Sequence, residues 1–305
     1  SHCILQFDGF RVTGTTAAPF TPFKEDGEVN YDLISKCVDF LKNNHFEYAF
    51  VNGTLAEGLS MTLEERKKVA EAWKSASEGK IKLILHIGTN CLKDSQELAR
   101  HAQQIGVEAV AALCPFFLKP ESEEILVDYI EQVAKEAPKL PFFYYAINFF
   151  TGIYLNDSKF LRLAKDRIPN LCGLKHSSRE LPNAFDCKLV DKKFQVLMGT
   201  DNQFLTCLSL GLDVPVTAPF MGKLYHEIKT AFDKGDIDEA RKIQIKVQKV
   251  NNIRQLYGGG IEAAKVIFSI TSGIDCGPVR LPLTNFSADR KASLAKDLKE
   301  SGLFS

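Results

Sequence analysis

The sequence has no net charge and no long apolar run, and each absence removes a class of function. Its 38 Lys and Arg residues balance 38 Asp and Glu residues. Proteins that bind nucleic acids or anionic membranes present a basic surface, so we expect neither kind of partner. No apolar stretch approaches the roughly 20 residues that a membrane-spanning helix needs. Chemistry on a small molecule remains open.

Histidine and closely spaced cysteine are also scarce. The chain has six histidines and eight cysteines, and no two cysteines form a Cys-x-x-Cys motif. A zinc site needs clustered ligands, so we predict no metal centre. The scattered thiols are expected to be buried and reduced, which favours a cytoplasmic location.

Short apolar runs alternate with amphipathic stretches through most of the chain. Eight runs of about five residues have the pattern of strands covered on both faces, at 12–17, 48–51, 83–87, 109–114, 142–147, 172–175, 195–198 and 214–218. Helical patterns lie between them. Eight strand–helix units in series predict the α/β class and a (β/α)8 TIM barrel. A doubly wound open sheet is the alternative, disfavoured because no Gly-x-Gly-x-x-Gly turn follows an early strand.

The strands stop after Phe220, and the remaining sequence has helical patterns. We therefore predict a catalytic barrel over residues 1–221, with the last barrel helix and a C-terminal helical extension over residues 222–305. Asn30 or Asp32 is expected to cap the first helix, and Thr62 opens a capping box. The run 258–260 is three glycines before a helix. Their amides could bind phosphate, but a helix–helix turn beyond the barrel is favoured because no Walker lysine follows.

A lysine closes the sixth predicted strand. Lys175 ends the apolar run 171–175, Tyr145 lies late in the fifth strand, Thr54 ends the second, and Asp201 follows the seventh. The active site of a parallel barrel lies at the C-terminal ends of its strands, so all four should face one opening. Burial penalises the charged form of an amine, and a neutral amine attacks a ketone. Schiff-base chemistry is therefore predicted.

Each of these four residues also has a purely structural interpretation. Lys175 could be a solvated charge, and Tyr145 could pack in the core with its hydroxyl hydrogen-bonded. Thr54 could belong to a plain turn, and Asp201 could cap the following helix. The combination of a buried lysine, a phenol on the adjacent strand and a hydroxyl in a glycine-flanked loop favours an imine-forming enzyme.

Several segments resemble the N-acetylneuraminate lyase and dihydrodipicolinate synthase family of class I aldolases. They are residues 16–23, 50–60, 115–120, 144–145, 151–152, 173–175 and 277–283. The resemblance implies a lyase that splits a 2-keto-3-deoxy sugar acid, such as N-acetylneuraminate, into pyruvate and an aldehyde. It implies no metal and no diffusible cofactor, a keto acid or aldehyde as the small-molecule partner, and a homotetramer.

The resemblance also implies roles for individual residues. Lys175 would form the imine with the C2 ketone of the substrate, Tyr145 would relay protons, and Thr54 would hydrogen-bond the phenol. Amides of the Thr54-Leu55 turn would hold the pyruvate carboxylate. The substrate-binding residues would be Leu55, Ser177, Gly199, Asp201, Asn202 and Ala218.

The chain departs from the family pattern at several positions. Leu55 and Ala56 stand where a second hydroxyl residue and a second glycine are usual, and Asn148 stands where a proline is usual. Asn202 replaces a glutamate and Ala218 a serine. These changes remove polar contacts from the acceptor side, the part of the site that would hold the aldehyde half of the substrate. Their loss should weaken the discrimination for a polyol. Two alternatives stay open: the same imine used on a less polar carbonyl or amine substrate, and a non-catalytic barrel retained for binding.

Overall fold

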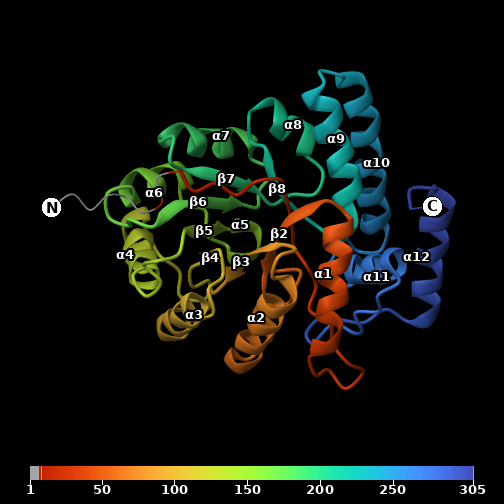
Figure 1. Cartoon of the computed structure of the whole chain (residues 1–305), viewed down its shortest axis with the longest axis horizontal. Coiled ribbons are helices and arrows are strands. Elements are labelled where there is room, and N and C mark those ends of the chain that lie inside the picture. Colours follow the sequence, from red (N-terminus) through yellow and green to blue (C-terminus); the bar gives the residue numbers. More distant parts are fainter. Residues whose placement is uncertain (1–6, 8, 305) are drawn as a thin grey trace.

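The structure is a computed structural model that describes residue 7 and residues 9–304. Eight parallel strands pair in sequence order, and the last pairs with the first to close a barrel (Figure 1). The predicted (β/α)8 barrel is confirmed. The strands are β1 (Thr15–Ala17), β2 (Phe46–Val51), β3 (Lys82–His86), β4 (Ala109–Ala112), β5 (Phe142–Ala146), β6 (Leu171–His176), β7 (Gln195–Met198) and β8 (Val214–Thr217).

Helices follow each strand and form the outer layer of the barrel. They are α1 (Ile34–Asn43), α2 (Leu63–Ser77), α3 (Leu92–Ile105), α4 (Glu123–Ala134), α6 (Asp157–Ala164), α7 (Leu181–Val190), α8 (Phe204–Ser209) and α9 (Gly222–Asp233). A short helix, α5 (Asn148–Thr151), and the 3-10 turns η1 (Tyr31–Leu33), η2 (Gly58–Ser60) and η3 (Pro219–Met221) complete the connections.

The C-terminal extension consists of α10 (Ile237–Leu256), α11 (Ile261–Ser272) and α12 (Ala288–Ser301). Figure 1 shows these helices on one side of the barrel, next to α1 and α9. The division of the chain at residue 221 stays a prediction. Over the residues that are described, no helix has both the length and the apolar composition that crossing a membrane requires.

Local sequence signals explain the start of α2 but not that of α1. Thr62 accepts a hydrogen bond from the Glu65 amide, and the Glu65 carboxylate accepts one from the Thr62 amide, so the predicted capping box is present. The predicted cap of the first helix is wrong. Because η1 takes up residues 31–33, α1 starts after Leu33 and receives no side-chain cap from Asn30 or Asp32.

The strands are buried on both faces, as their continuous apolar sequence predicts. Side chains that point outward from the sheet pack under the helices, while a second cluster, including Phe50, Ile84, Phe143 and Tyr145, fills the barrel interior. The thiols of Cys37, Cys114, Cys187, Cys207 and Cys276 are buried, as expected, whereas that of Cys91 is exposed.

Candidate active site

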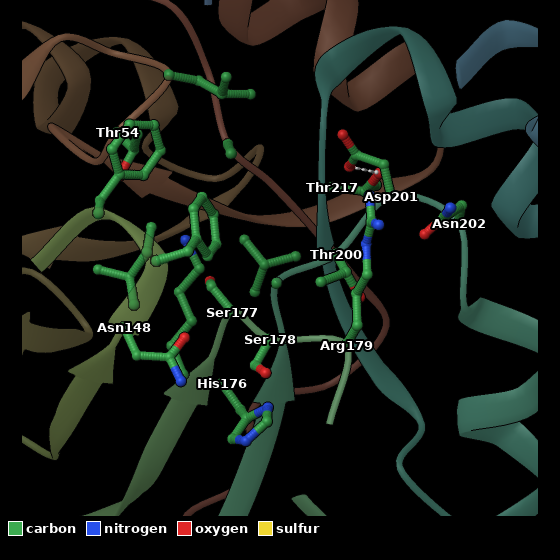
Figure 2. Close-up of a pocket in the computed structure, with 18 of the residues that line it drawn as sticks. Thr54, Asn148, His176, Ser177, Ser178, Arg179, Thr200, Asp201, Asn202 and Thr217 are labelled. Carbon is green, nitrogen blue, oxygen red and sulfur yellow. Dashed lines mark hydrogen bonds between the residues drawn. The ribbon is translucent and has the colours of Figure 1, made fainter. Parts of the chain in front are cut away.

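One cavity of about 930 Å³ lies at the C-terminal ends of the strands. Figure 2 shows Thr54 on one side of it and Asp201 with Thr217 on the other, with Ser177 and Ser178 between them. Every residue that the sequence predicts for the site lines this cavity: Thr54, Leu55, Tyr145, Lys175, Ser177, Gly199, Asp201, Asn202 and Ala218. The cavity is therefore the place to test their predicted roles.

Lys175 lies inside the barrel near the end of β6. Its side chain passes over two aromatic rings, with Nζ 3.9 Å from the centroid of Phe50 and 4.2 Å from that of Tyr145. The residue is 4% exposed, and its amine makes no hydrogen bond or ion pair with a described residue. The interpretation of Lys175 as a solvated charge is wrong, because the amine is enclosed by the aromatic rings and faces the cavity.

Tyr145 and Thr54 come together from opposite parts of the chain. The Tyr145 hydroxyl and Thr54 Oγ1 are 2.8 Å apart and share a hydrogen bond. Tyr145 is also the direct neighbour of Lys175 in the β5–β6 register. The phenol, the hydroxyl and the amine therefore form one group at the closed end of the cavity. This arrangement places a proton donor and acceptor beside a nucleophile.

His86, a residue that the sequence analysis missed, packs against this group. The His86 ring packs edge-on against Tyr145, at 5.3 Å between centroids, and its Nδ1 lies 2.9 Å from the Asn52 carbonyl oxygen. Burial and the neighbouring Arg66 guanidinium hold the pKa of His86 well below its ordinary value, so the ring is neutral. His86 sits in the apolar run 83–87, where a histidine could have been noticed as an interior polar group.

The loop after β2 has a constrained backbone. Asn52 and Glu57 both adopt left-handed conformations, with φ of 61° and 55°. Gly58 packs so closely that a Cβ would stand 2.0 Å from the Asn52 carbonyl oxygen. The amides of Thr54 and Leu55 donate to no described residue. Amides without a protein partner at a cavity wall are free to donate hydrogen bonds to an anionic group.

Close packing explains why residue 199 is a glycine. A Cβ at this position would lie 2.2 Å from Ser177 Oγ and 3.0 Å from Lys175 Cε. The glycine therefore leaves room for the lysine side chain in its observed position. Ser177 is buried and lies two residues beyond the lysine along the chain.

The carboxylate of Asp201 is already bound by protein groups. Its Oδ1 accepts hydrogen bonds from the Thr217 hydroxyl at 2.8 Å and the Ala218 amide at 3.2 Å. Its Oδ2 pairs with Arg254 on α10 at 3.1 Å. The alternative that Asp201 caps the next helix is wrong, because α8 starts after Gln203 and has no side-chain cap.

The extension contributes a further wall of the cavity that the sequence analysis missed. Polar residues from the end of α10 line it, together with the glycine turn and the start of α11: Gln248, Asn251, Asn252, Arg254, Gln255, Gly259, Gly260 and Ile261. The glycine run is a helix–helix turn, as predicted. Its expected position beyond the barrel is wrong, because the extension folds back over the strand ends.

A half-buried acid lies at the start of α6, beside the end of β6. Asp157 lines the cavity, and its Oδ2 is 3.7 Å from His176 Nε2. Burial, with a smaller contribution from the Glu123 charge, raises the pKa of Asp157 to about 7. Burial also lowers the pKa of His176, despite its hydrogen bond with Asn183. Both shifts favour a neutral pair. Among the described residues, no three His, Cys, Asp or Glu side chains are grouped to hold a metal ion.

Comparisons with known proteins agree with this architecture. The N-acetylneuraminate lyase of Homo sapiens is 38% identical over 303 residues, which cover 97% of this chain and 94% of the relative. The N-acetylneuraminate lyase of Xenopus tropicalis is 40% identical over 283 residues, covering 92% and 93%.

A solved structure extends the similarity to three dimensions. The N-acetylneuraminate lyase of Aliivibrio salmonicida superposes with a TM-score of 0.93 at 34% identity, covering 97% of this chain and 99% of the other. A sequence model of the dihydrodipicolinate synthetase family matches residues 11–301. The chain therefore belongs to the dihydrodipicolinate synthetase family.

Proposed function

We propose that this protein is a class I aldolase that cleaves N-acetylneuraminate into pyruvate and N-acetylmannosamine. The names of its relatives support this substrate, since lyases at 35–40% identity span nearly the whole chain. The observation that carries the proposal is the amine of Lys175, which is enclosed by the rings of Phe50 and Tyr145, faces the cavity and forms no ion pair with any residue that the structure describes.

The imine forms between Lys175 and the open-chain ketone. The lone pair of Nζ attacks C2, and loss of the ketone oxygen as water gives a protonated imine. The amides of Thr54 and Leu55 hold the carboxylate next to this carbon. Holding the carboxylate fixes the distance and angle of the attack, which is a large part of the rate gain in a two-component reaction.

The phenol of Tyr145 serves the bond-breaking step. A base takes the proton from the C4 hydroxyl, the C3–C4 electron pair moves into the imine, and the aldehyde leaves. The resulting enamine takes a proton at C3, and water then releases pyruvate from the lysine. The hydrogen bond between Thr54 and Tyr145 at 2.8 Å orients the phenol and gives its proton a place to move.

A cleavage assay tests this function directly. We expect the purified protein to release pyruvate from N-acetylneuraminate, detected by a coupled dehydrogenase. The panel should include a 2-keto-3-deoxy sugar acid without the acetamido group and a keto acid with an apolar tail. Selective cleavage of N-acetylneuraminate supports the proposal, and pyruvate release only from the other substrates contradicts it.

The acceptor side favours a second candidate, the same imine chemistry on a less polar aldehyde. Asp201 has both oxygens occupied by protein donors, and Ala218 offers only an apolar surface. Phe149, Phe150 and Tyr154 are exposed and line the opening. Preferred cleavage of the keto acid with the apolar tail in the same panel would support this candidate.

We also infer a homo-oligomer, a tetramer by family resemblance. Five large apolar side chains are exposed on two segments, after β4 and on and just after α5: Phe117, Leu118, Phe149, Phe150 and Tyr154. The two segments lie close together, because a Cβ added at Gly152 would stand 3.1 Å from Lys119 Cε. An exposed apolar patch of this kind is typical of a subunit interface. Size-exclusion chromatography with light scattering should give a molar mass near four times that of one chain, and the mass of a monomer would contradict this inference.

We also infer a cytoplasmic location, which the buried, unpaired thiols support.

A further inference from the structure

The loop that presents Thr54 and Leu55 is tied to the C-terminal extension by a buried ion pair. Glu57 belongs to this loop, and its Oε2 accepts a hydrogen bond from Lys265 Nζ at 3.1 Å. The two residues are 208 positions apart in the sequence. Both side chains are almost fully enclosed, at 1% and 2% exposed. The contact therefore joins the barrel loop to α11 where water cannot screen the charges.

Every polar atom of this pair has a partner. Glu57 Oε1 accepts from the Arg280 amide at 2.7 Å, and Lys265 Nζ also donates to the Pro278 carbonyl at 2.8 Å. The Lys265 amine lies 4.3 Å from the centroid of the Phe23 ring. Burial lowers the pKa of Lys265, and the Glu57 carboxylate partly offsets this shift. The Arg280 side chain adds a second connection by binding Glu65 at the start of α2.

The backbone explains why the loop needs such an anchor. Glu57 is held in a left-handed conformation that non-glycine residues rarely adopt. Its amide donates to the Thr54 carbonyl at 3.0 Å, and the Gly58 amide donates to the Gly53 carbonyl at 3.1 Å. The turn that exposes the Thr54 and Leu55 amides is thus closed on one side by Glu57. A strained backbone of this kind persists only where its surroundings fix it.

We propose that Lys265 is a positioning residue for the carboxylate-binding loop, and that the extension sets the affinity for the keto acid through the Glu57–Lys265 ion pair. Lys265 does not line the cavity and does not contact the reacting atoms. It acts through Glu57, whose conformation fixes the Thr54 hydroxyl against Tyr145 and the two amides toward the carboxylate. This inference rests on the proposed imine chemistry, but not on the identity of the sugar acceptor.

The test is inactivation by borohydride in the presence of increasing pyruvate. The pyruvate concentration that gives half-maximal inactivation reports carboxylate binding and imine formation together. Lys265→Met leaves the Glu57 carboxylate buried without its partner. We expect its half-saturating concentration to rise by about tenfold to hundredfold, the scale on which small displacements of a preorganised site act. The matched control is Leu294→Ala on α12, which removes a fully buried side chain from the same extension. It should lower the melting temperature and leave pyruvate binding unchanged.

A double variant separates positioning from stability. In Lys265→Met with Glu57→Gln, no lone buried charge remains, so much of the lost stability should return. The raised half-saturating concentration should remain, and this variant also serves if Lys265→Met alone does not fold. The proposal is overturned if the folded variants bind pyruvate as the wild type does, or if Leu294→Ala shifts binding equally. A wild type that traps no pyruvate would instead contradict the proposed function.

Discussion

The two ends of the cavity differ in whether their polar groups are already bound. At the closed end, the Lys175 amine and the amides of Thr54 and Leu55 have no partners among the described residues. At the acceptor end, Asp201 is held by Thr217 and Arg254. Unpartnered groups at a preorganised wall are ready for a ligand, whereas bound groups must exchange partners first. The closed end can therefore bind a ligand without rearrangement of its polar groups, whereas the acceptor end cannot.

The largest effect should follow from removing the amine at the closed end. Lys175→Ala deletes the nucleophile, and we expect cleavage of N-acetylneuraminate to fall by about 10⁴-fold or more. Circular dichroism should show an unchanged fold, because the shortened side chain faces the cavity. Residual activity close to that of the wild type would rule out the imine route.

A smaller loss should follow from removing the phenolic hydroxyl. Tyr145→Phe keeps the ring that packs against Phe50 but cannot donate or accept the proton. We expect kcat to fall by about 10²- to 10⁴-fold, the usual range for a general acid–base group. Trapping of pyruvate by borohydride should survive. A variant that turns over at the wild-type rate would remove Tyr145 from the proton path.

A substitution at the acceptor end should have a weaker effect, and only on the binding of the sugar acid. Asp201→Asn removes the charge that pairs with Arg254 and is the acidic group nearest to Thr217 and Ala218. We expect the KM for N-acetylneuraminate to rise by about tenfold, as for loss of one charged hydrogen bond. The half-saturating pyruvate concentration should not change. If both values rise together, the two ends are not independent.

The smallest expected effect is on the free energy of unfolding, and it comes from Asp157, which belongs to neither the Lys175 group nor the Asp201 group. Because burial raises the pKa of Asp157 to about 7, while an unfolded carboxyl ionises near pH 4, the folded state binds the extra proton between these values. The stability of the wild type should therefore fall as pH rises through this window. Asp157→Asn cannot ionise, so it should match the wild type below pH 4. Above pH 7 it should be more stable, by about 2 kcal/mol.

Urea unfolding at several pH values measures this difference. The cavity admits some water to the carboxyl, and His176 lies 3.7 Å away, so both reduce the penalty below that of a fully isolated charge. An equal stability difference at pH 4 and pH 8 would show that Asp157 does not titrate in this range. Asp166, an exposed acidic residue just beyond the C-terminal end of α6, provides the control variant Asp166→Asn.

The fold could be predicted because each of its signals is local. A strand with both faces buried is a continuous apolar run, as at 142–147, and a capping box is four adjacent residues, as at Thr62. The predicted strand at 12–17 was longer than β1 because apolar content does not fix where pairing begins. The 3-10 turn before α1 also left no signal that distinguishes it from a helix start.

The site could be predicted only where residues follow a strand. The C-terminal ends of parallel barrel strands meet at one face, and this rule alone places Thr54, Tyr145, Lys175 and Asp201 at one opening. It cannot assign residues that arrive from outside the barrel. Arg254 and Lys265 lie on helices whose packing depends on distant contacts, and nothing in their neighbouring sequence indicates an ionic partner.

The most direct test of the central claim is reductive trapping followed by peptide mapping. Wild-type protein is treated with pyruvate and borohydride, digested, and examined by mass spectrometry. Our account predicts a reduced pyruvate adduct on the peptide that contains Lys175 and on no other lysine. An adduct on a different lysine, or none from folded protein at saturating pyruvate, would contradict it.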